Sequence, residues 1–315
     1  MATLAIHGGA GTIPRESFTP ESYAAAREGL RQALAGGWAV LNKGGLALDA
    51  VEAAVVALED HPSFNAGRGA VLNRGREHEL DAGIMDGRTL AAGAVASARH
   101  IRNPIRAARL VMDASECVLL AGAGADAFAE EQGLQMVEQS YFTTPLREQH
   151  WQRADEEREG KLQRSRTEAE KHGTVGAVAL DEVGNLAAAT STGGYTYKRV
   201  GRVGDAPVFG AGTYARNGVV AVSCTGLGEY FIRRCTAHDI AARIHYGGAQ
   251  LQDATRIAID ELKSDGAGAG LIAIDGKGAV SLVHNTEGMY RGSVTADGVF
   301  SVGIYANDFA PIQLG

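Results

Sequence analysis

Residues 171–181, KHGTVGAVALD, mark the sharpest change of character in this chain of 315 residues. Before this segment, 14 of the 25 residues from Arg147 to Lys171 are charged, seven of each sign. After it, apolar runs at Val175–Leu180 and Leu186–Ala189 flank the turn-forming sequence DEVGN, which is typical of a β-hairpin. We therefore expect a solvated helix or a mobile linker over residues 147–172, followed by a buried strand that starts at Thr174.

The step from Gly173 to Thr174 is a candidate site of chemistry. If this peptide bond were cut, Thr174 would carry both a hydroxyl nucleophile and a free α-amine. The amine suits a general base, because its reference pKa of about 7.7–8.0 leaves a usable neutral fraction near pH 7. An isolated Gly-Thr pair is more simply explained as the start of a strand, so the neighbouring sequence has to decide.

Polar side chains in the second half of the chain could complete such a site. Residues 189–194, ATSTGG, place hydroxyl groups at the end of the hairpin's partner strand, where they could reach Thr174. Arg202 and Asp205 suit the carboxylate and the ammonium of a zwitterion, or they form an exposed salt bridge in their loop. Residues 223–229, SCTGLGE, lead from a strand into a helix N-terminus, where they could stabilise an oxyanion or simply cap the helix.

The remaining sequence indicates strands and helices in separate groups. A short strand over Leu4–Ile6 leads into a glycine turn at His7–Gly11, and strands broken by turns are expected over residues 71–95. A second hairpin is expected at residues 271–283. Helices are predicted at residues 20–42, 48–59, 104–112, 229–246 and 251–263, with another that ends at Gly133. This grouping predicts an α+β fold in which packed sheets are covered by helices.

Composition and missing motifs exclude several classes of function. The 30 Lys and Arg residues against 37 Asp and Glu give a net charge of −7, which argues against a nucleic-acid-binding protein. No run approaches the ~18 apolar residues of a membrane span, and the N-terminus lacks a secretory signal, so we expect a cytoplasmic protein. The glycine-rich HGGAG lacks the P-loop lysine, and no HExxH zinc motif occurs. Cys117, Cys224 and Cys235 form no CxxC pair, and the last two are expected to be buried as small hydrophobic residues.

Eight motifs give the chain a resemblance to a known family. They are HGGAG, FNAGRGAVLN, ELDAGIMDG, GTVGAVALD, ATSTGG, GRVGD, SCTGLGE and NTEGMYRG, all in family order. The sequence resembles the plant-type (class 3) L-asparaginases, also called isoaspartyl peptidases, of the N-terminal-nucleophile (Ntn) hydrolase superfamily, over essentially the whole chain. The resemblance implies a single domain over residues 1–315 with a four-layer αββα sandwich. It also implies that the chain cuts itself between Gly173 and Thr174, giving an α subunit (1–173) and a β subunit (174–315).

The resemblance further implies an amidohydrolase with small-molecule substrates and no cofactor for catalysis. It would hydrolyse L-asparagine to aspartate and ammonia, and β-aspartyl (isoaspartyl) dipeptides to aspartate and an amino acid. Thr174 would be the nucleophile and Thr192 would hydrogen-bond to it, while Thr225 and the Gly226 N–H would stabilise the oxyanion. Two processed units would form an (αβ)2 dimer, without nucleic-acid or membrane partners.

Substrate and ion sites are also implied by the resemblance. Arg202 and Asp205 would hold the α-carboxylate and the α-ammonium, Gly228 would line their pocket together with Thr225 and Gly226, and Asn65 would lie near the nucleophile. A structural sodium ion would order the loop that carries Asn65, because oxygen-only coordination suits a hard cation. Its ligands would be the main-chain carbonyl groups of Leu58, Glu59, His61, Phe64, Ala66 and Arg68.

Two other functions stay open at this point. A glycosylasparaginase-like amidase would share the chemistry, although the missing signal peptide counts against it. An unprocessed, non-catalytic binding protein of the same fold would remain a single band on a denaturing gel.

Overall fold

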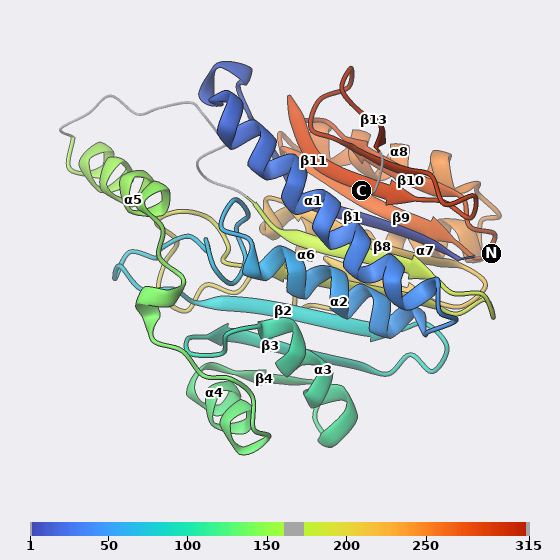
Figure 1. Cartoon of the computed structure of the whole chain (residues 1–315), viewed down its shortest axis with the longest axis horizontal. Coiled ribbons are helices and arrows are strands. Elements are labelled where there is room, and N and C mark those ends of the chain that lie inside the picture. The colour runs from blue at the N-terminus through green and yellow to red at the C-terminus, as the bar shows by residue number, and fades with distance from the viewer. Residues whose placement is uncertain (1, 161–172, 313–315) are drawn as a thin grey trace.

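The structure is a computed structural model that describes residues 2–160 and 173–312, and two β-sheets form its centre (Figure 1). The larger sheet has the strand order β13-β12-β11-β1-β5-β6-β2-β3-β4. All neighbouring strands pair antiparallel except β3 and β4. The strands of this sheet are β1 (Thr3–Gly11), β2 (Leu80–Asp86), β3 (Ala92–Ala98), β4 (Leu119–Ala121), β5 (Val175–Leu180), β6 (Leu186–Thr192), β11 (Gly288–Val294), β12 (Phe300–Gly303) and β13 (Ala310–Ile312).

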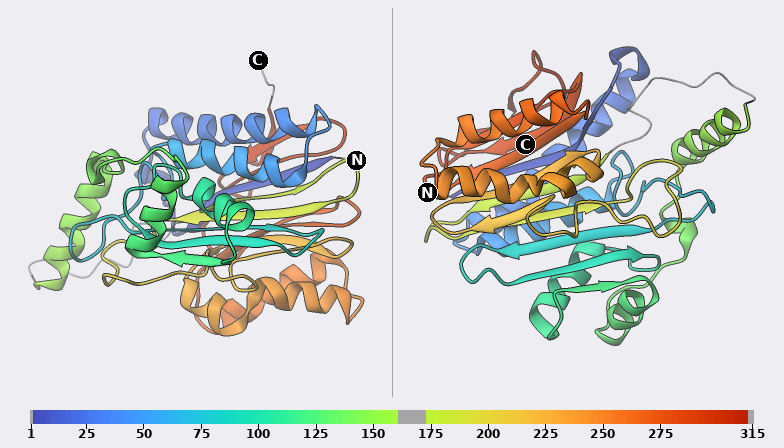
Figure 2. Two further views of the ribbon diagram at one scale, coloured as in Figure 1. Left: turned by 90° about the horizontal axis from the view of Figure 1, so that it is seen from below. Right: turned by 180° about the vertical axis from the view of Figure 1, so that it is seen from behind.

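The smaller sheet stacks on the larger one, as Figure 2 shows. Its order is β10-β9-β8-β7, with β7 (Thr213–Arg216), β8 (Val220–Gly226), β9 (Ala269–Asp275) and β10 (Val280–His284). Small and medium apolar side chains such as Ala5, Val178, Ala188, Ala221 and Ile272 fill the space between the sheets. Both faces of the central strands are therefore buried, and β1, β5 and β6 lack the polar alternation of half-exposed strands.

Helices pack on the outer faces of both sheets (Figure 2). α1 (Pro20–Leu41), α2 (Ala47–Asp60) and α3 (Pro104–Ala114) cover the larger sheet, and α4 (Gly122–Glu131) packs beside β3. α7 (Thr236–His245) and α8 (Leu251–Ser264) cover the smaller sheet, and α6 (Gly228–Arg234) precedes α7. Because each helix buries one apolar face, this arrangement produces separate helix–sheet cores around the central one.

The hairpins and most helices agree with the sequence-based predictions. α1 begins where Thr19 and Pro20 predicted it, and the Thr19 side chain accepts a hydrogen bond from the Ser22 amide. The β5–β6 hairpin pairs Val175 with Ser191, and β6 continues beyond the predicted Ala189 to Thr192. This extension carries the predicted hydroxyl group of Thr192 to the start of β5.

Four local predictions were wrong. The glycine turn at His7–Gly11 is part of β1, because the strand continues with a bulge between His7 and Gly9. No strand lies over residues 71–79. The single helix predicted over residues 229–246 is broken at Cys235, whose φ of 48° lies in the left-handed region. Cys235 is also exposed, whereas Cys224 is buried as predicted.

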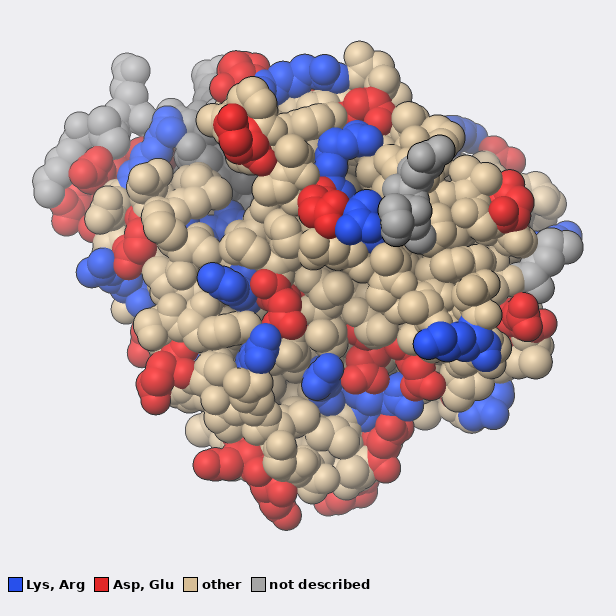
Figure 3. All heavy atoms as spheres, viewed as in Figure 1, with Lys and Arg blue, Asp and Glu red and all other residues tan. Residues whose placement is uncertain are grey.

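The charged segment before Thr174 begins as a helix. α5 (Pro145–Arg158) starts at Thr144, whose side chain accepts from the Arg147 amide, and Trp151 donates to the carbonyl oxygen of Asn73. The expectation for residues 161–172 lies outside the described residues. Among the helices of the described ranges, none combines the length and apolar character needed to cross a membrane. On the face drawn in Figure 3, basic and acidic side chains are intermixed rather than gathered in a basic stripe.

Candidate active site

The hairpin register places Thr174 beside Thr192 at one end of the larger sheet. Val175 pairs with Ser191, so the residue before β5 meets the last residue of β6. The Oγ1 atoms of the two threonines are 3.1 Å apart, and Thr174 Oγ1 is 2.8 Å from the carbonyl oxygen of Gly173. Both threonines are buried. The hydroxyl group of Thr174 is therefore held beside the peptide bond that precedes it.

The carbonyl group of Gly173 accepts hydrogen bonds from two other side chains. Asn65 Nδ2 donates to it at 2.8 Å and Thr192 Oγ1 at 2.9 Å. Asn65 is fixed at both ends of its amide, because Nδ2 also donates to the Gly194 carbonyl oxygen and Oδ1 accepts from the Val71 amide. Donors aimed at a carbonyl oxygen stabilise the negative charge that develops there during nucleophilic attack.

His7 adds a contact that the sequence analysis missed. Its ring nitrogens lie 3.0 Å from the carbonyl oxygen of Thr174 and 2.9 Å from Ser223 Oγ. Burial lowers the pKa of His7 to about 3, so the imidazole is neutral. His7 was assigned to a glycine turn; treating residues 3–11 as one strand would have placed it on the same face as Ala5, toward the smaller sheet.

Thr225 and Gly226 end strand β8, on the side of the smaller sheet that meets β1 and β5. Thr225 is fully buried, and its Oγ1 accepts a hydrogen bond from the Ala10 amide at 3.2 Å. Ser223 lies two residues earlier on the same face of β8, where it contacts His7. The stacking of the two sheets therefore places Thr225 against β1, the strand that pairs with β5 in the larger sheet.

Arg202, Asp205 and Gly228 gather at a second point of the site, together with Glu229. Arg202 donates from Nε and Nη2 to the two carboxylate oxygens of Glu229, both at 3.0 Å. A Cβ atom on Gly228 would lie 2.6 Å from Asp205 Oδ1 and 2.9 Å from Arg202 Nη2. Glycine is therefore required at residue 228, because a side chain would displace the acid or the guanidinium.

Arg202 and Asp205 are more buried than the partners of an exposed salt bridge would be. Asp205 is buried, and its Oδ2 has no hydrogen-bond partner among the described residues. Burial raises the pKa of Asp205 to about 7, against the opposing charge of Arg202. For Arg202, burial acts to lower the pKa, but hydrogen bonds to Glu229 and the nearby acids raise it above its ordinary value. The guanidinium of Arg202 beside the buried Oδ2 of Asp205 suits a ligand that carries both a negative and a positive group.

The stretch from Thr192 to Gly194 connects this charged pair to Thr174. Thr192 Oγ1 accepts from the Gly194 amide at 2.9 Å, and the Gly194 carbonyl oxygen accepts from Asn65. A Cβ atom on Gly194 would lie 3.3 Å from Arg202 Nη1. The structure therefore brings Thr174, Thr192, Asn65 and Arg202 into one connected site.

The loop after α2, where main-chain sodium ligands are predicted, is tightly folded, and the Glu59 carbonyl oxygen accepts a hydrogen bond from the Arg68 amide at 2.7 Å. The carbonyl oxygen of Glu59 would lie 2.6 Å from a Cβ atom on Gly67, and that of Phe64 would lie 2.7 Å from one on Gly69. Both glycines have positive φ angles, so the loop requires glycine at residues 67 and 69. Within residues 2–160 and 173–312, no cluster of three or more His, Cys, Asp or Glu side chains could hold a metal ion. Any ion here would depend on backbone oxygens, which suit a hard cation.

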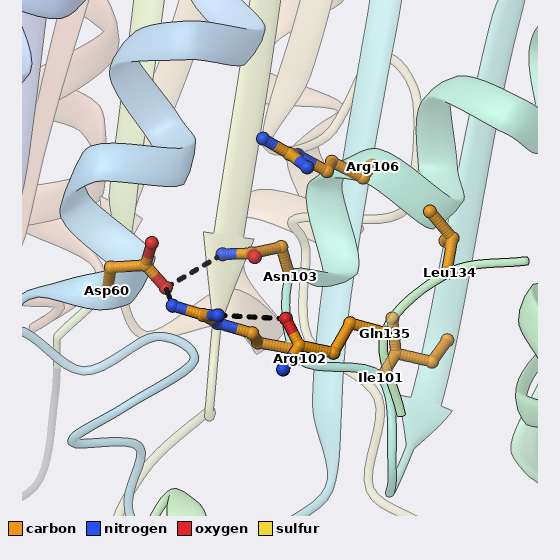
Figure 4. A pocket seen from close by; sticks show the side chains of 7 residues that line it. All are labelled: Asp60, Ile101, Arg102, Asn103, Arg106, Leu134 and Gln135. Carbon is orange, nitrogen blue, oxygen red and sulfur yellow. Dashed lines mark hydrogen bonds and ion pairs between the residues drawn. The ribbon is translucent and has the colours of Figure 1, made fainter. Parts of the chain in front are cut away.

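Two acidic side chains fix this loop where it leaves α2. Glu59 is fully buried and accepts from Ser191 Oγ at 2.6 Å and from the Ile105 amide at 3.0 Å. Asp60 accepts from Asn103 Nδ2 and pairs with Arg102, which also donates to Gln135 across a hollow of about 190 Å³ (Figure 4). The contacts of Asp60 with Asn103 and Arg102 therefore tie the C-terminal end of α2 to the segment before α3.

The sequence of this chain is similar to those of known hydrolases. A family model described as "Asparaginase" matches residues 1–304. The isoaspartyl peptidase of Salmonella typhimurium is 50% identical over 308 residues, which cover 96% of this chain and 98% of that protein. The isoaspartyl peptidase of Escherichia coli is 50% identical, with 96% of each chain covered. A probable isoaspartyl peptidase/L-asparaginase 2 of Arabidopsis thaliana is 38% identical, with 96% of this chain and 98% of that protein covered.

Proposed function

Because the chain belongs to the asparaginase family, we propose that it is an autocleaving threonine hydrolase that acts on L-asparagine and on β-aspartyl dipeptides. One observation carries the proposal: Thr174 Oγ1 lies 3.1 Å from Thr192 Oγ1 and beside the Gly173 carbonyl group, which Asn65 also contacts. A buried hydroxyl group, a polarised carbonyl group and a peptide nitrogen that becomes an amine on cleavage are the parts that such an enzyme needs.

Self-cleavage uses the contacts at Gly173. Thr174 Oγ1 attacks the Gly173 carbonyl carbon, the C–N bond breaks, and the nitrogen takes up a proton to become the α-amine of Thr174. The acyl group moves to oxygen as an ester, which water hydrolyses to release the Gly173 carboxylate. Asn65 and Thr192 stabilise the charge on the carbonyl oxygen during the attack.

Substrate hydrolysis repeats this chemistry with the new amine as the base. Thr174 Oγ1 attacks the side-chain carbonyl of the substrate while the amine accepts its proton, and Thr192 orients the hydroxyl group. Thr225 and the Gly226 N–H stabilise the oxyanion. The amine then gives the proton to the departing ammonia or amino acid, and water hydrolyses the β-aspartyl ester. No step requires a cofactor.

Arg202 and Asp205 select a substrate with both an α-carboxylate and an α-ammonium group. Arg202 binds the carboxylate of Glu229 bidentately, and this contact supports the proposal that the guanidinium binds the substrate's carboxylate beside Glu229 or in its place. The unfilled Oδ2 of Asp205 accepts the ammonium, and Gly228 leaves the space for both.

The finer features of the family complete the proposal. The stacked sheets and their outer helices correspond to the four-layer αββα sandwich of Ntn hydrolases, and two processed units form an (αβ)2 heterotetramer in the cytoplasm. A sodium ion binds the carbonyl oxygens of Leu58, Glu59, His61, Phe64, Ala66 and Arg68. It supplies no chemistry to the reaction and orders the loop that holds Asn65.

Purified protein tests the proposal directly. After incubation, a denaturing gel should show bands near 18 and 15 kDa, in proportion to 173 and 142 of the 315 residues of the 32.8 kDa chain. N-terminal sequencing of the smaller band should begin Thr-Val-Gly-Ala. The cleaved protein should release aspartate from L-asparagine and from a β-aspartyl dipeptide. A single band of full length with no hydrolysis would favour a binding protein instead.

The pH dependence of product binding should follow the ionisation of the Asp205 carboxyl group. Burial raises its pKa to about 7, so below that pH the carboxyl group becomes neutral and loses its attraction for an ammonium group. We expect the inhibition constant of L-aspartate to rise about 10- to 100-fold from pH 7 to pH 5. Protonation of the Thr174 amine acts in the opposite direction, since it attracts the product's carboxylate. Asp205→Asn should bind aspartate weakly without this rise, and a flat or falling constant in the unmodified enzyme would contradict the assignment.

A further inference from the structure

A cavity of about 660 Å³ opens beside the cleavage site, on the Gly173 side of the peptide bond. Gly173 and Asn65 lie on its wall, together with the backbone of residues 8–11. Phe18 and Tyr290 contribute aromatic rings. Residues between 13 and 22 form another part of the lining, and one face of α5, the helix drawn at the edge of the molecule near the start of α1 in Figure 1, forms a further wall. None of the roles proposed so far uses this space.

The α5 wall of the cavity is cationic. Arg147, His150 and Arg153 are spaced three residues apart, so they share one face of the helix, and all three line the cavity. Arg153 also lies 3.6 Å from Glu157 on the same helix. Glu16, on the opposite wall, is an exposed acid of the lining. The positive charge therefore belongs to the side of the cavity that α5 forms.

Two of these groups are buried without an anionic partner. Arg147 is 8% exposed, its Nε donates to the Gly69 carbonyl oxygen, and no carboxylate of the described residues lies within ion-pair distance of it. His150 Nδ1 is buried with no hydrogen-bond partner among those residues. Burial lowers the pKa of Arg147 to about 10 and that of His150 to about 4, so near pH 7 His150 is neutral and the positive charge of the wall comes from Arg147 and Arg153. Burying an uncompensated guanidinium is costly, so this wall is suited to receive an anion.

The chemistry of cleavage identifies which anion reaches this wall. Before processing, the nitrogen of Thr174 carries Gly173; after processing, the same nitrogen must give a proton to the leaving group. The leaving group therefore departs on the side where Gly173 lies, which is the rim of the cavity. Ammonia from asparagine fills little of this space. An amino acid leaving a β-aspartyl dipeptide brings a side chain and a free carboxylate.

We propose that this cavity is the leaving-group subsite for β-aspartyl dipeptides, in which Arg147 and Arg153 bind the terminal carboxylate of the departing residue. The apolar surfaces of Phe18 and Tyr290 contact that residue's side chain. This inference rests on the proposed function and extends it to the second half of the substrate. The carboxylate that cleavage creates on Gly173 has the same chemistry, and the test below separates the two sources.

Three substrates separate the carboxylate contact from the rest of the reaction. β-Aspartyl-leucine carries the terminal carboxylate, β-aspartyl-leucinamide lacks only its charge, and L-asparagine has no leaving residue. Charge-assisted hydrogen bonds typically change a rate by about 10- to 100-fold. We expect the unmodified enzyme to have kcat/KM about 10- to 100-fold higher for the acid than for the amide, with rates normalised to the cleaved fraction on a gel.

Arg153→Gln should reduce this acid-to-amide ratio to about one-tenth or less of its original value. Arg147→Met should lower the acid-to-amide ratio in the same way, provided that the variant chain still cleaves itself. If it does not, the Arg153→Gln result alone decides the test. Arg158→Gln is the matched control, because Arg158 lies on the same helix but stacks over Tyr197, and its ratio should equal that of the unmodified enzyme.

Two outcomes would overturn the inference. A ratio near one in the unmodified enzyme would mean that the substrate's carboxylate does not reach the cavity, which would leave the Gly173 carboxylate as its occupant. An Arg153→Gln ratio equal to that of Arg158→Gln would exclude binding by the α5 wall. Failure to hydrolyse L-asparagine as well would instead count against the proposed function, because that substrate does not use this subsite.

Discussion

Thr174→Ala is expected to leave the chain as one 32.8 kDa band and to reduce hydrolysis of both substrate classes by about 10⁴- to 10⁶-fold. The substitution removes the hydroxyl group that attacks Gly173 and the hydroxyl group that attacks the substrate, which are the same atom. It therefore also prevents the release of the α-amine. The measurement combines a denaturing gel over several days with aspartate release from L-asparagine and from a β-aspartyl dipeptide.

Thr174→Ser is the matched control for this experiment. It keeps the hydroxyl group 3.1 Å from Thr192 and the nitrogen that becomes the amine, so it should process and retain measurable hydrolysis at a reduced rate. Substantial β-aspartyl hydrolysis by the Thr174→Ala variant would show that Thr174 is not the nucleophile. A fully cleaved Thr174→Ala protein would instead place the processing chemistry elsewhere.

Thr225→Ala is expected to lower kcat by about 10²- to 10³-fold with a much smaller change in KM, because an oxyanion donor acts mainly in the transition state. The same change leaves the buried Ala10 amide without its acceptor, which should cost about 1–3 kcal/mol of stability. Steady-state kinetics on the cleaved enzyme and thermal unfolding would measure the two effects separately.

Two controls distinguish the catalytic from the structural loss. Thr225→Ser keeps the hydroxyl group and should retain most of kcat. Thr255→Ala removes another fully buried threonine hydroxyl, on α8, where it bonds to the Leu251 carbonyl oxygen and to Ser281. It should destabilise the protein without the large loss of kcat. Equal losses of kcat in Thr225→Ala and Thr255→Ala would argue that Thr225 acts through stability alone.

Much of the fold could be predicted from local pattern. The Thr19-Pro20 start of α1 and the β5–β6 hairpin depend on neighbouring residues, so they agree with the sequence-based predictions. The family inferred from the ordered motifs is confirmed by a family match over residues 1–304. The predictions failed where tertiary packing overrode local preference. The glycines after His7 usually indicate a turn, but pairing with β11 continues as far as Gly11, beyond the end of the β5 pairing at His7, and keeps β1 extended through them.

The candidate site shows the same division. Thr174, Thr192, Arg202 and Asp205 lie in short glycine- or hydroxyl-rich stretches whose chemistry can be recognised one stretch at a time. The sequence analysis did not anticipate that Arg202 would face Glu229, or that Asp205 would be buried with an unfilled oxygen. These features depend on how loops from different parts of the chain pack, and burial decides the charge state of each group.

The sequence by itself determined that the Thr174 hydroxyl group lies next to the Gly173–Thr174 peptide bond. A Gly-Thr step at the start of a strand is fixed by the covalent order of the residues. Only the tertiary structure decided what surrounds that bond. His7 reaches Thr174 across 167 positions of sequence, Glu59 reaches Ser191 across 132, and Arg147 faces a cavity walled by the first strand. Such contacts arise when two sheets stack and a helix packs at their edge, and short-range patterns carry no record of that packing.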